Sequence, residues 1–393
     1  MRISKRVRSV RSSATMAVSA KAMDLRAEGR EVVSLSVGEP GFPTPEHICR
    51  AAREAVDQGF TRYTQVPGMP ELREAVAGYF NGFYGTKAPA EAVIVTNGGK
   101  HALYNLLQVL LDPGDRVLIL APYWVSYPAM VLLAGGEPIV VPASAARGFK
   151  VSPEDLDRAW TPGTRVLILN SPSNPTGVHY TQEELDALAS WAVSRDVFVI
   201  SDEIYDQLVY DPAKPAGLAS WWDRHPEHTA VVNGLSKSFA MTGWRVGYAL
   251  AHPELIKALS KIQGQSTSNV CSIAQKAALA ALTGPMDALK HMRAVFARRR
   301  DLAMEIVGLW PDVVCPRPDG AFYIFPDVSA HYNDAVPDST ALCTALLEGA
   351  GVAAVPGAAF GDEGCVRFSY AVDDEVLIKA LGMAWDVIRA AGT

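Results

Sequence analysis

One lysine of the chain, Lys237, has surroundings that suggest chemistry. It lies in the segment LSKSFAMTGWRVGYAL, between Ser236 and Ser238 and among apolar residues, just before a β-rich run at 244–251. A lysine amine placed between buried runs costs free energy unless it has a partner. We therefore expect this amine to be bonded to another group, and other polar residues of the sequence indicate which one.

A glycine-rich turn, Asn97-Gly98-Gly99-Lys100, follows the apolar run AVIVT and precedes a helical pattern. Glycines at a strand-to-helix turn let backbone N–H groups approach an anion, and the helix N-terminus favours negative charge. A phosphate suits such a turn. The turn matches neither GxxxxGK[ST] nor GxGxxG, so both nucleotide fingerprints are missing. An ordinary tight turn is the alternative, because glycine is common there.

Two further polar side chains follow or end apolar runs. Asn174 lies in the loop SPSNPTG after RVLILN, where two prolines would hold its amide in a fixed position. Asp202 comes at the end of VFVIS, with Tyr205 three residues further on. A carboxylate at the end of a buried strand must be paired. The alternatives are a plain turn for Asn174 and a helix N-cap for Asp202.

One small molecule could use all of these groups. Lys237 follows the run AVVNGL, and Arg245 lies eight residues beyond it. Pyridoxal 5'-phosphate (PLP) has an aldehyde for a lysine and a pyridine nitrogen for a carboxylate. It also has a phenolate oxygen for Asn and Tyr, and a phosphate for glycine N–H groups, serine and arginine. The sequence therefore predicts a PLP site.

The elements that would position these residues form a repeating pattern between residues 92 and 251. Most of the β-rich runs are separated by helix-length amphipathic segments, and the runs are AVIVT, RVLIL, PIVVPA, RVLILN, VFVIS, AVVNGL and RVGYALA. Continuous Val, Ile and Leu indicate strands buried on both faces. The alternation predicts an α/β fold with a mostly parallel seven-stranded sheet covered by helices. Ligands bind such sheets beyond the carboxyl ends of the strands.

The pattern changes after about residue 285. A long charged helix is expected at 286–310, followed by GAFYIFPDV, a helix, CVRFSYA and a final helix. We predict three parts: an N-terminal arm with part of a small domain at 1–45, a large PLP-binding domain at 46–285, and a small α+β domain at 286–393. We also expect the domains to close over a cleft, with the long helix as connector.

Composition argues against several classes of protein. The 393 residues are enough for two domains, and the net charge of -6 argues against a nucleic-acid binder. The five cysteines form no CxxC pair and have no histidine nearby at ligand spacing, which argues against zinc and favours a reducing cytoplasm. The basic, serine-rich start could be a transit peptide. We expect instead a solvated start leading into a helix, because no apolar h-region and no membrane-length apolar run follows.

Motifs over nearly the whole chain resemble the class I and II aminotransferases of PLP fold type I. They occur in family order: VVSLSVGEPGFPTP, FTRYTQVPG, TNGGKHAL, PYWVSYP, NSPSNPTG, SDEIYD, SKSFAMTGWRVGY and VRFSY. The branch most similar to this chain is that of the bacterial aspartate aminotransferases, which often also act on prephenate. The resemblance implies transfer of an amino group between aspartate or glutamate and 2-oxo acids, by a homodimer with shared active sites.

The resemblance also implies which residues would bind the cofactor. Lys237 would be the Schiff-base lysine and proton carrier, and Asp202 would keep the pyridine nitrogen protonated. Asn174 and Tyr205 would bond the phenolic oxygen. Trp124 would stack on the ring. The phosphate would be held by Gly98, Gly99, Ser236 and Arg245, with Tyr63 reaching in from the second subunit, and Lys100 of the same glycine turn is also expected to lie at the cofactor.

A second group of residues would bind the substrate, with Trp124 and Asn174 bordering it. Arg367 would hold the α-carboxylate in a bidentate manner, and Gly38 would contact it through the backbone. The best-known aspartate aminotransferases bind the distal carboxylate with an arginine, but the segment GQSTSNVCSIAQ has none. The similar branch uses the lysine of the Gly-Gly-Lys turn, which in this chain is Lys100. The alternative is that Lys100 supports the phosphate or faces solvent. Thr15 is expected to help accept prephenate.

Other functions remain as alternatives on the same fold. An aminotransferase for aromatic or other neutral amino acids, a PLP-dependent β-lyase or an aminocyclopropane-carboxylate synthase would keep the cofactor residues. A non-enzymatic PLP-binding regulator would need a winged-helix DNA reader, and we expect none before residue 30. An NAD dehydrogenase would need the glycine fingerprint and its acidic residue downstream.

Overall fold

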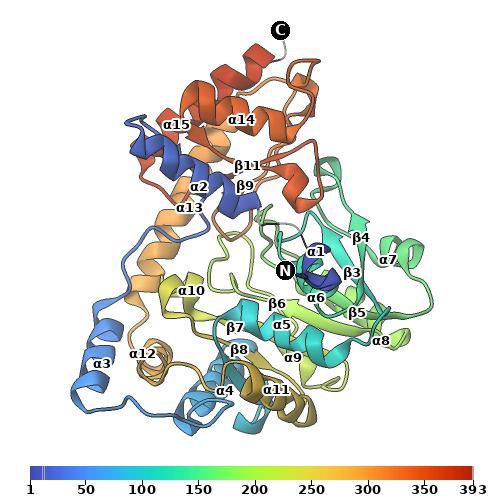
Figure 1. Cartoon of the computed structure of the whole chain (residues 1–393), viewed down its shortest axis with the longest axis vertical. Coiled ribbons are helices and arrows are strands. Elements are labelled where there is room, and N and C mark those ends of the chain that lie inside the picture. Colours follow the sequence, from blue (N-terminus) through green and yellow to red (C-terminus); the bar gives the residue numbers. More distant parts are fainter. Residues whose placement is uncertain (11, 13, 392–393) are drawn as a thin grey trace.

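The computed structural model describes residues 1–10, 12 and 14–391, and a seven-stranded sheet lies at its centre (Figure 1). The strand order is β2-β8-β7-β6-β5-β3-β4, and only β8 runs antiparallel to its neighbours. The strands are β2 Val93–Thr96, β3 Arg116–Ala121, β4 Glu137–Pro142, β5 Thr164–Asn170, β6 Phe198–Asp202, β7 Thr229–Gly234 and β8 Gly247–Leu250. The expected mostly parallel sheet is confirmed.

The start of the last strand was wrongly predicted. The run was expected to begin at Trp244, but β8 begins at Gly247. Residues Thr242–Trp244 form a turn of 3-10 helix, and Arg245 has a left-handed backbone with φ 56°. An extended strand cannot continue through such a residue. Arg245 therefore lies in the loop that precedes β8 and not within a strand.

Helices cover both faces of this sheet, which explains its continuous apolar strands. In β5, Val166 and Ile168 belong to one hydrophobic cluster, whereas Leu167 and Leu169 belong to another on the opposite face. Successive side chains of a strand point to opposite faces, so a strand covered on both sides needs apolar residues throughout.

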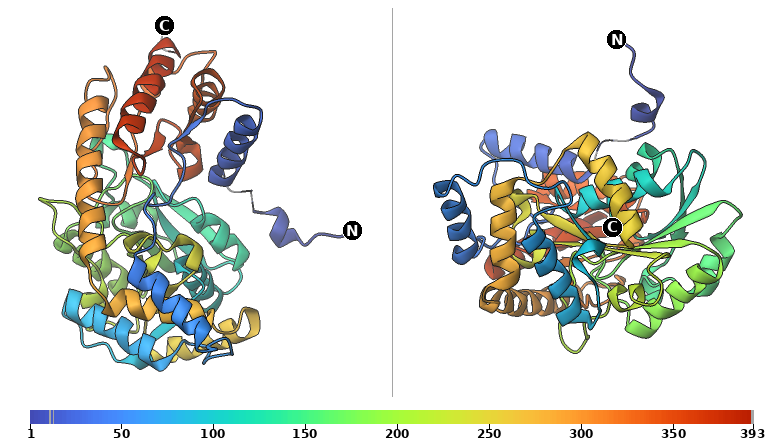
Figure 2. Two further views of the ribbon diagram at one scale, coloured as in Figure 1. Left: turned by 90° about the vertical axis from the view of Figure 1, so that its left-hand side faces the viewer. Right: turned by 90° about the horizontal axis from the view of Figure 1, so that it is seen from below.

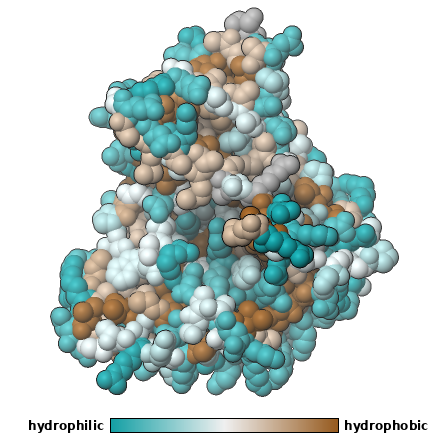
Figure 3. Space-filling view, in the orientation of Figure 1, coloured by the Kyte–Doolittle hydropathy of each residue, from teal (hydrophilic) through white to brown (hydrophobic). Residues whose placement is uncertain are grey.

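The helices of the described chain vary from a single turn to the long α13. In sequence order they are α1 Lys5–Arg8, α2 Ala14–Ala27, α3 Glu46–Asp57, α4 Pro70–Tyr84, α5 Gly99–Leu110, α6 Tyr127–Leu133, α7 Pro153–Ala159, α8 Gln182–Ser194, α9 Ala219–Trp222, α10 Leu235–Ser238, α11 Pro253–Ser266, α12 Ser272–Thr283, α13 Asp287–Val307, α14 Ser339–Ala350 and α15 Asp374–Ala391. None of these helices is long and apolar enough to cross a membrane. The face seen in Figure 3 is largely hydrophilic, with hydrophobic residues in separate patches.

A second region lies beside the sheet and combines α2, from the N-terminal part of the chain, with the C-terminal part (Figures 1 and 2). It holds a three-stranded sheet of β11 Val355–Pro356, β12 Val366–Ser369 and β9 Tyr323–Ile324. Strand β1, Val33–Ser34, pairs in parallel with β10, Val352–Ala353. Helix α13 runs from the large sheet to this region (Figure 1). The pairing of β1 places the loop that follows it between the two regions.

Candidate active site

A cavity of about 400 Å³ lies beyond the carboxyl ends of strands β5, β6 and β7. Most of the site residues predicted from the sequence line it together: Thr15, Gly38, Gly99, Lys100, Trp124, Asn174, Asp202, Tyr205, Ser236, Lys237, Arg245 and Arg367. They come from both regions of the chain. Parallel strands end at one edge of a sheet, which is why residues so distant in sequence meet at this cavity.

Two predicted residues do not line this cavity. Gly98 precedes the N-terminus of α5 with φ 84°, and a Cβ atom there would lie 2.6 Å from Arg245 Nη2. The position therefore requires glycine both for its backbone and for the close approach of the arginine. Tyr63 is 91% exposed and lies outside the cavity of its own chain.

Lys237 is placed in the cavity by the short helix α10, which begins directly after β7. Its Nζ donates a hydrogen bond to the carbonyl oxygen of Gly38 at 2.5 Å. Burial lowers the pKa of Lys237 to about 8, and the positive charges of Arg367 and Arg245 act in the same direction. More of this amine is neutral near pH 7 than of an exposed lysine, so it is better able to accept a proton.

Asp202 ends β6 with its carboxylate buried, only 4% exposed. It accepts hydrogen bonds from the Tyr127 hydroxyl at 2.7 Å and from the Ile204 N–H at 3.3 Å. Burial raises the pKa of Asp202 to about 6, although the bond from Tyr127 opposes this shift. The helix N-cap alternative is wrong, because after Asp202 the next helix in the described chain is α9, at Ala219.

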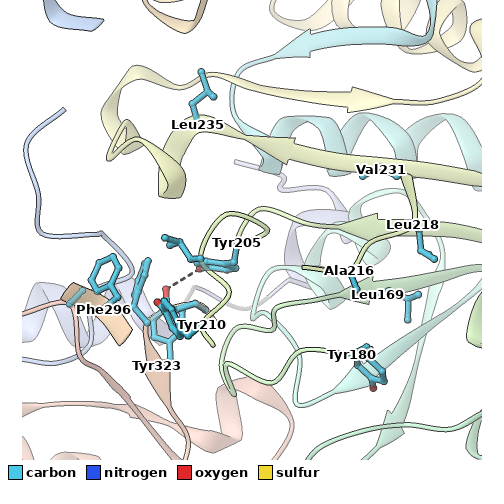
Figure 4. Packing of buried hydrophobic residues seen from close by; sticks show 14 of the residues in the cluster. Leu169, Tyr180, Tyr205, Tyr210, Ala216, Leu218, Val231, Leu235, Phe296 and Tyr323 are labelled. Carbon is cyan, nitrogen blue, oxygen red and sulfur yellow. Dashed lines mark hydrogen bonds between the residues drawn. The ribbon is translucent and has the colours of Figure 1, made fainter. Parts of the chain in front are cut away.

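Sequence analysis missed Tyr127 and Tyr323, both of which line the cavity and are buried. Tyr127 lies in the motif PYWVSYP, and Tyr323 in GAFYIFP. The hydroxyl of Tyr323 lies 3.1 Å from that of Tyr205, and the two side chains point toward each other (Figure 4). A buried tyrosine hydroxyl usually has a partner, but the sequence does not distinguish these two tyrosines from core aromatic residues.

Arg367 extends from β12 into the cavity and is 2% exposed. Its Nη1 donates to the Asn174 side-chain oxygen at 2.9 Å, and its Nη2 to the Ser36 carbonyl oxygen at 2.6 Å. Its buried Nε has no hydrogen-bond partner among the described residues. No described carboxylate forms an ion pair with this guanidinium. A buried positive charge without a negative partner is costly, so the site favours an anionic ligand.

The glycine turn and Arg245 form one compact corner of the cavity. Helix α5 begins at Gly99, and Ser236 and Arg245 face the cavity from the segment after β7. A Cβ atom on Gly247 would lie 2.3 Å from the Gly99 nitrogen, so the turn is packed directly against β8. Backbone N–H groups at a helix N-terminus, a hydroxyl and a guanidinium make a suitable site for a phosphate.

Lys100 lies at the start of α5, on the same wall of the cavity as Trp124. Its Nζ is 4.7 Å from the centre of the Trp124 ring. Partial desolvation lowers the pKa of Lys100, and Arg245 lowers it further. The residue is exposed on one side and lines the cavity on the other. It thus provides a second cationic group that a ligand in the cavity can reach, in addition to Arg367.

The residues present fit PLP. The anion-binding corner matches its phosphate, the buried Asp202 carboxylate matches its pyridine nitrogen, and the Lys237 amine matches its aldehyde. The unpaired Arg367 then remains available for the carboxylate of an amino acid.

Comparison with known proteins gives the same result. Residues 30–382 match the model of a family described as aminotransferase class I and II. The chain is 48% identical to the aspartate/prephenate aminotransferase of Cereibacter sphaeroides over 382 residues, which is 94% of each chain. It is 44% identical to the aspartate aminotransferase of Bacillus subtilis, over 97% of each chain. A structure of the aspartate aminotransferase from Thermus thermophilus with maleate superimposes with a TM-score of 0.93 at 47% identity, and covers 98% of this chain and 100% of that chain.

The sheet order and the cavity residues define an enzyme of PLP fold type I. Within that class, the chain belongs to the class I and II aminotransferases, and PLP is its cofactor.

Proposed function

We propose that this aminotransferase acts on dicarboxylic amino acids. It would move the amino group between aspartate or glutamate and the 2-oxo acids oxaloacetate and 2-oxoglutarate, with prephenate as a further acceptor. The observation that carries this proposal is the pair of cationic groups, Arg367 and Lys100, on the walls of one cavity. Neither forms an ion pair with a described carboxylate, so each can bind one carboxylate of the substrate. The names of the relatives support the same substrate class.

The cofactor supplies an aldehyde that joins an amino group and a ring that accepts negative charge. Asp202 holds a proton on the ring nitrogen, because its carboxylate is buried and would otherwise carry an unpaired charge. Asn174 and Tyr205 bind the phenolic oxygen, and Trp124 covers the ring. The phosphate would be held by Gly98, Gly99, Ser236 and Arg245, with Lys100 beside them in the same turn.

Lys237 moves the proton at the Cα atom of the substrate. Its lowered pKa supports this role, since a base works best when its pKa is near the working pH. Arg367 and the Gly38 backbone hold the α-carboxylate, which fixes the Cα atom beside the amine. Lys100 binds the distal carboxylate.

We further propose that the enzyme is a cytoplasmic homodimer. Tyr63 is 91% exposed and outside its own cavity, which is expected of a residue that reaches the phosphate in the partner subunit. The cysteines of the chain are free, in keeping with a reducing compartment. The domain division at residues 45 and 285 belongs to the same proposal, with α13 as the connector.

A half-reaction screen tests the proposed substrate class. The PLP-loaded protein is mixed with one amino acid at a time, and the cofactor absorbance is followed as the amino group is transferred. Aspartate and glutamate should react at least about tenfold more efficiently than alanine or phenylalanine, which lack the second carboxylate. A preference for neutral amino acids would overturn the assignment of Lys100. Release of ammonia instead of an oxo acid and an aminated acceptor would indicate a β-lyase.

A further inference from the structure

A buried carboxylate, Asp206, lies one residue beyond Tyr205 and outside the cavity. It is 2% exposed, and its Oδ2 accepts three hydrogen bonds. The donors are the Asn233 side-chain amide at 2.7 Å, the Tyr84 hydroxyl at 3.1 Å and the Tyr79 hydroxyl. Tyr79 and Tyr84 belong to α4, whereas Asn233 belongs to β7. Asp206 thus joins α4 and β7, although it does not line the cavity of the candidate site.

Asn233 links Asp206 to the turn that carries the lysine. While its amide nitrogen donates to Asp206, its side-chain oxygen accepts a hydrogen bond from the Gly234 N–H at 2.7 Å. Gly234 is the residue at which the chain leaves β7 and enters α10, which holds Ser236 and Lys237. The orientation of one buried amide therefore fixes the start of the turn that carries the lysine.

We propose that Asp206 is a positioning residue of the active site, which holds the lysine-bearing turn through Asn233 and holds Tyr205 through the adjacent backbone. An ionised carboxylate can only accept hydrogen bonds, so it forces the NH₂ group of Asn233 toward itself. The amide oxygen must then face the Gly234 N–H. Without an acceptor at residue 206, the buried NH₂ group of Asn233 loses its partner, and only the bond from the Gly234 N–H still holds the amide in place.

Gly234 is tightly packed, so a displacement of Gly234 would also move the active-site residues that follow it. A Cβ atom on Gly234 would lie 3.2 Å from the Ile204 side chain and 3.0 Å from the Gly247 Cα. Gly234 is therefore closely packed between Ile204 and the start of β8. A shift of its first residue moves Ser236 and Lys237, and a displacement of about 1 Å in a positioned group can cost up to about 100-fold in rate.

The segment that carries Asp206 also offers a matched control, Glu203, directly after β6. It is also buried, at 0% exposed, and its side chain accepts from the Ser201 hydroxyl at 2.8 Å and the Leu218 N–H at 2.6 Å. Neither of these donors lines the cavity. Removal of either acid leaves buried donors without an acceptor and lowers stability. Only removal of Asp206 should also disturb the cofactor and the lysine.

The experiment compares Asp206→Ala, Asp206→Asn, Glu203→Ala and Asn233→Ala. For each we measure the PLP dissociation constant, kcat and KM for aspartate, and the midpoint of thermal unfolding. Asp206→Ala should weaken PLP binding and lower kcat by about 10- to 100-fold each, with little change in KM. In Asp206→Asn, PLP binding and kcat should both stay within about twofold of wild type, because the side-chain oxygen of asparagine can take the place of Oδ2. Glu203→Ala should lose stability while PLP binding and kcat change by less than about twofold.

A double-mutant cycle provides the second measurement. Asn233→Ala should reproduce the effect of Asp206→Ala, and the double variant should be no worse than Asp206→Ala alone, because both act through one hydrogen bond. Equal effects of Glu203→Ala and Asp206→Ala on binding and kcat, or additive effects in the cycle, would overturn the proposal. Should Asp206→Ala not fold, the comparison of Asn233→Ala with Glu203→Ala decides in the same way.

The role of Asp206 rests on the proposed roles of Lys237 and Ser236, but it can fail independently of them. Failure of the proposed function would appear in the Lys237→Ala variant, as turnover that persists without the lysine. Failure of the Asp206 proposal would leave the Lys237→Ala result intact and would appear only as equality of the two buried-acid variants.

Discussion

The amine of Lys237 donates to the carbonyl oxygen of Gly38 at 2.5 Å, although the two residues are 199 positions apart in the chain. The loop that carries Gly38 follows β1, and Lys237 follows β7. Gly38 also packs closely on its other neighbour, since a Cβ atom there would lie 2.9 Å from the Tyr323 hydroxyl. The lysine of the large sheet is therefore covered by a loop whose position is set in the second region.

Lys237→Ala should abolish transamination while PLP still binds through the phosphate corner. Turnover should fall by at least about 1000-fold, because both the covalent attachment and the proton carrier are lost. Treatment with borohydride should fix PLP covalently to the wild-type protein but not to the variant, as measured by mass spectrometry. Turnover near the wild-type rate would refute the assignment.

Asp202→Asn should keep the shape of the side chain but remove its charge. The proton on the ring nitrogen would then lack its counter-charge, so kcat should fall by about 100- to 1000-fold, as for loss of a key electrostatic stabiliser. Steady-state kinetics with aspartate would measure this. Near-normal kcat would mean that the carboxylate is only a structural group at the strand end.

Tyr127→Phe should raise the pKa of Asp202 above its present value of about 6, because the hydroxyl that stabilises the charged carboxylate is removed. A hydrogen bond to a charged group is worth about 1.5–3 kcal/mol, which corresponds to a rise of about one to two pH units. Carboxyl NMR of the cofactor-free protein would follow the titration. Tyr123→Phe, in the same segment, is the control, and an unchanged pKa in Tyr127→Phe would contradict the assignment.

Lys100→Ala should lower kcat/KM for aspartate by about 10- to 100-fold, the loss of one charge-assisted hydrogen bond of about 1.5–3 kcal/mol. Activity on alanine or phenylalanine should change much less, because these substrates have no distal carboxylate. Kinetics with both classes of substrate give the comparison. An equal loss for both classes would make Lys100 a phosphate-binding or structural residue.

Glu203→Gln should reduce the loss of stability at higher pH. Burial raises the pKa of Glu203 to about 7 from the ordinary value of 4.5, and the nearby Asp206 contributes to this rise. The folded state thus binds this proton more tightly than the unfolded chain does. The resulting stability is present below pH 4.5 and is lost as pH rises through about 7, by at most about 1.4 kcal/mol per pH unit.

Urea unfolding at about pH 5 and pH 8 would measure this difference. The wild-type free energy of unfolding should fall more between the two conditions than that of Glu203→Gln, which cannot titrate at this position. The side chains around Glu203, namely Ser201, Tyr84 and Asp206, are common to both proteins. Equal falls would show that Glu203 is not the titrating group.

The sequence was sufficient to predict the large sheet and the edge at which the cavity lies. Apolar runs such as RVLILN and VFVIS have no polar positions in their interior, so they are buried on both faces, and polar residues that follow them must lie at strand ends. Local features were less predictable. The strand expected from Trp244 starts at Gly247 because Arg245 adopts a left-handed backbone, which its residue type does not indicate.

Partners of buried side chains could not be predicted in the same way. The hydroxyl of Tyr127 bonds Asp202, and that of Tyr323 faces Tyr205 across the two regions. In the sequence both tyrosines are indistinguishable from core aromatic residues. The packing of α6 beside the sheet brings Tyr127 to Asp202, and the packing of the second region against the sheet brings Tyr323 to Tyr205. Residues that support a site indirectly, such as Asp206, are still harder to recognise in the sequence.

The pairing of β1 with β10 has a consequence for the order of events during synthesis. Val33 is paired with Val352, so 352 - 33 = 319 residues must be added before β1 can find its partner. At about 5–20 residues per second, this takes roughly 15 to 60 s. By then the strands from Val93 to Leu250 have all left the ribosome. A nascent chain therefore carries Lys237 for part of this interval before the loop with Gly38 can cover its amine.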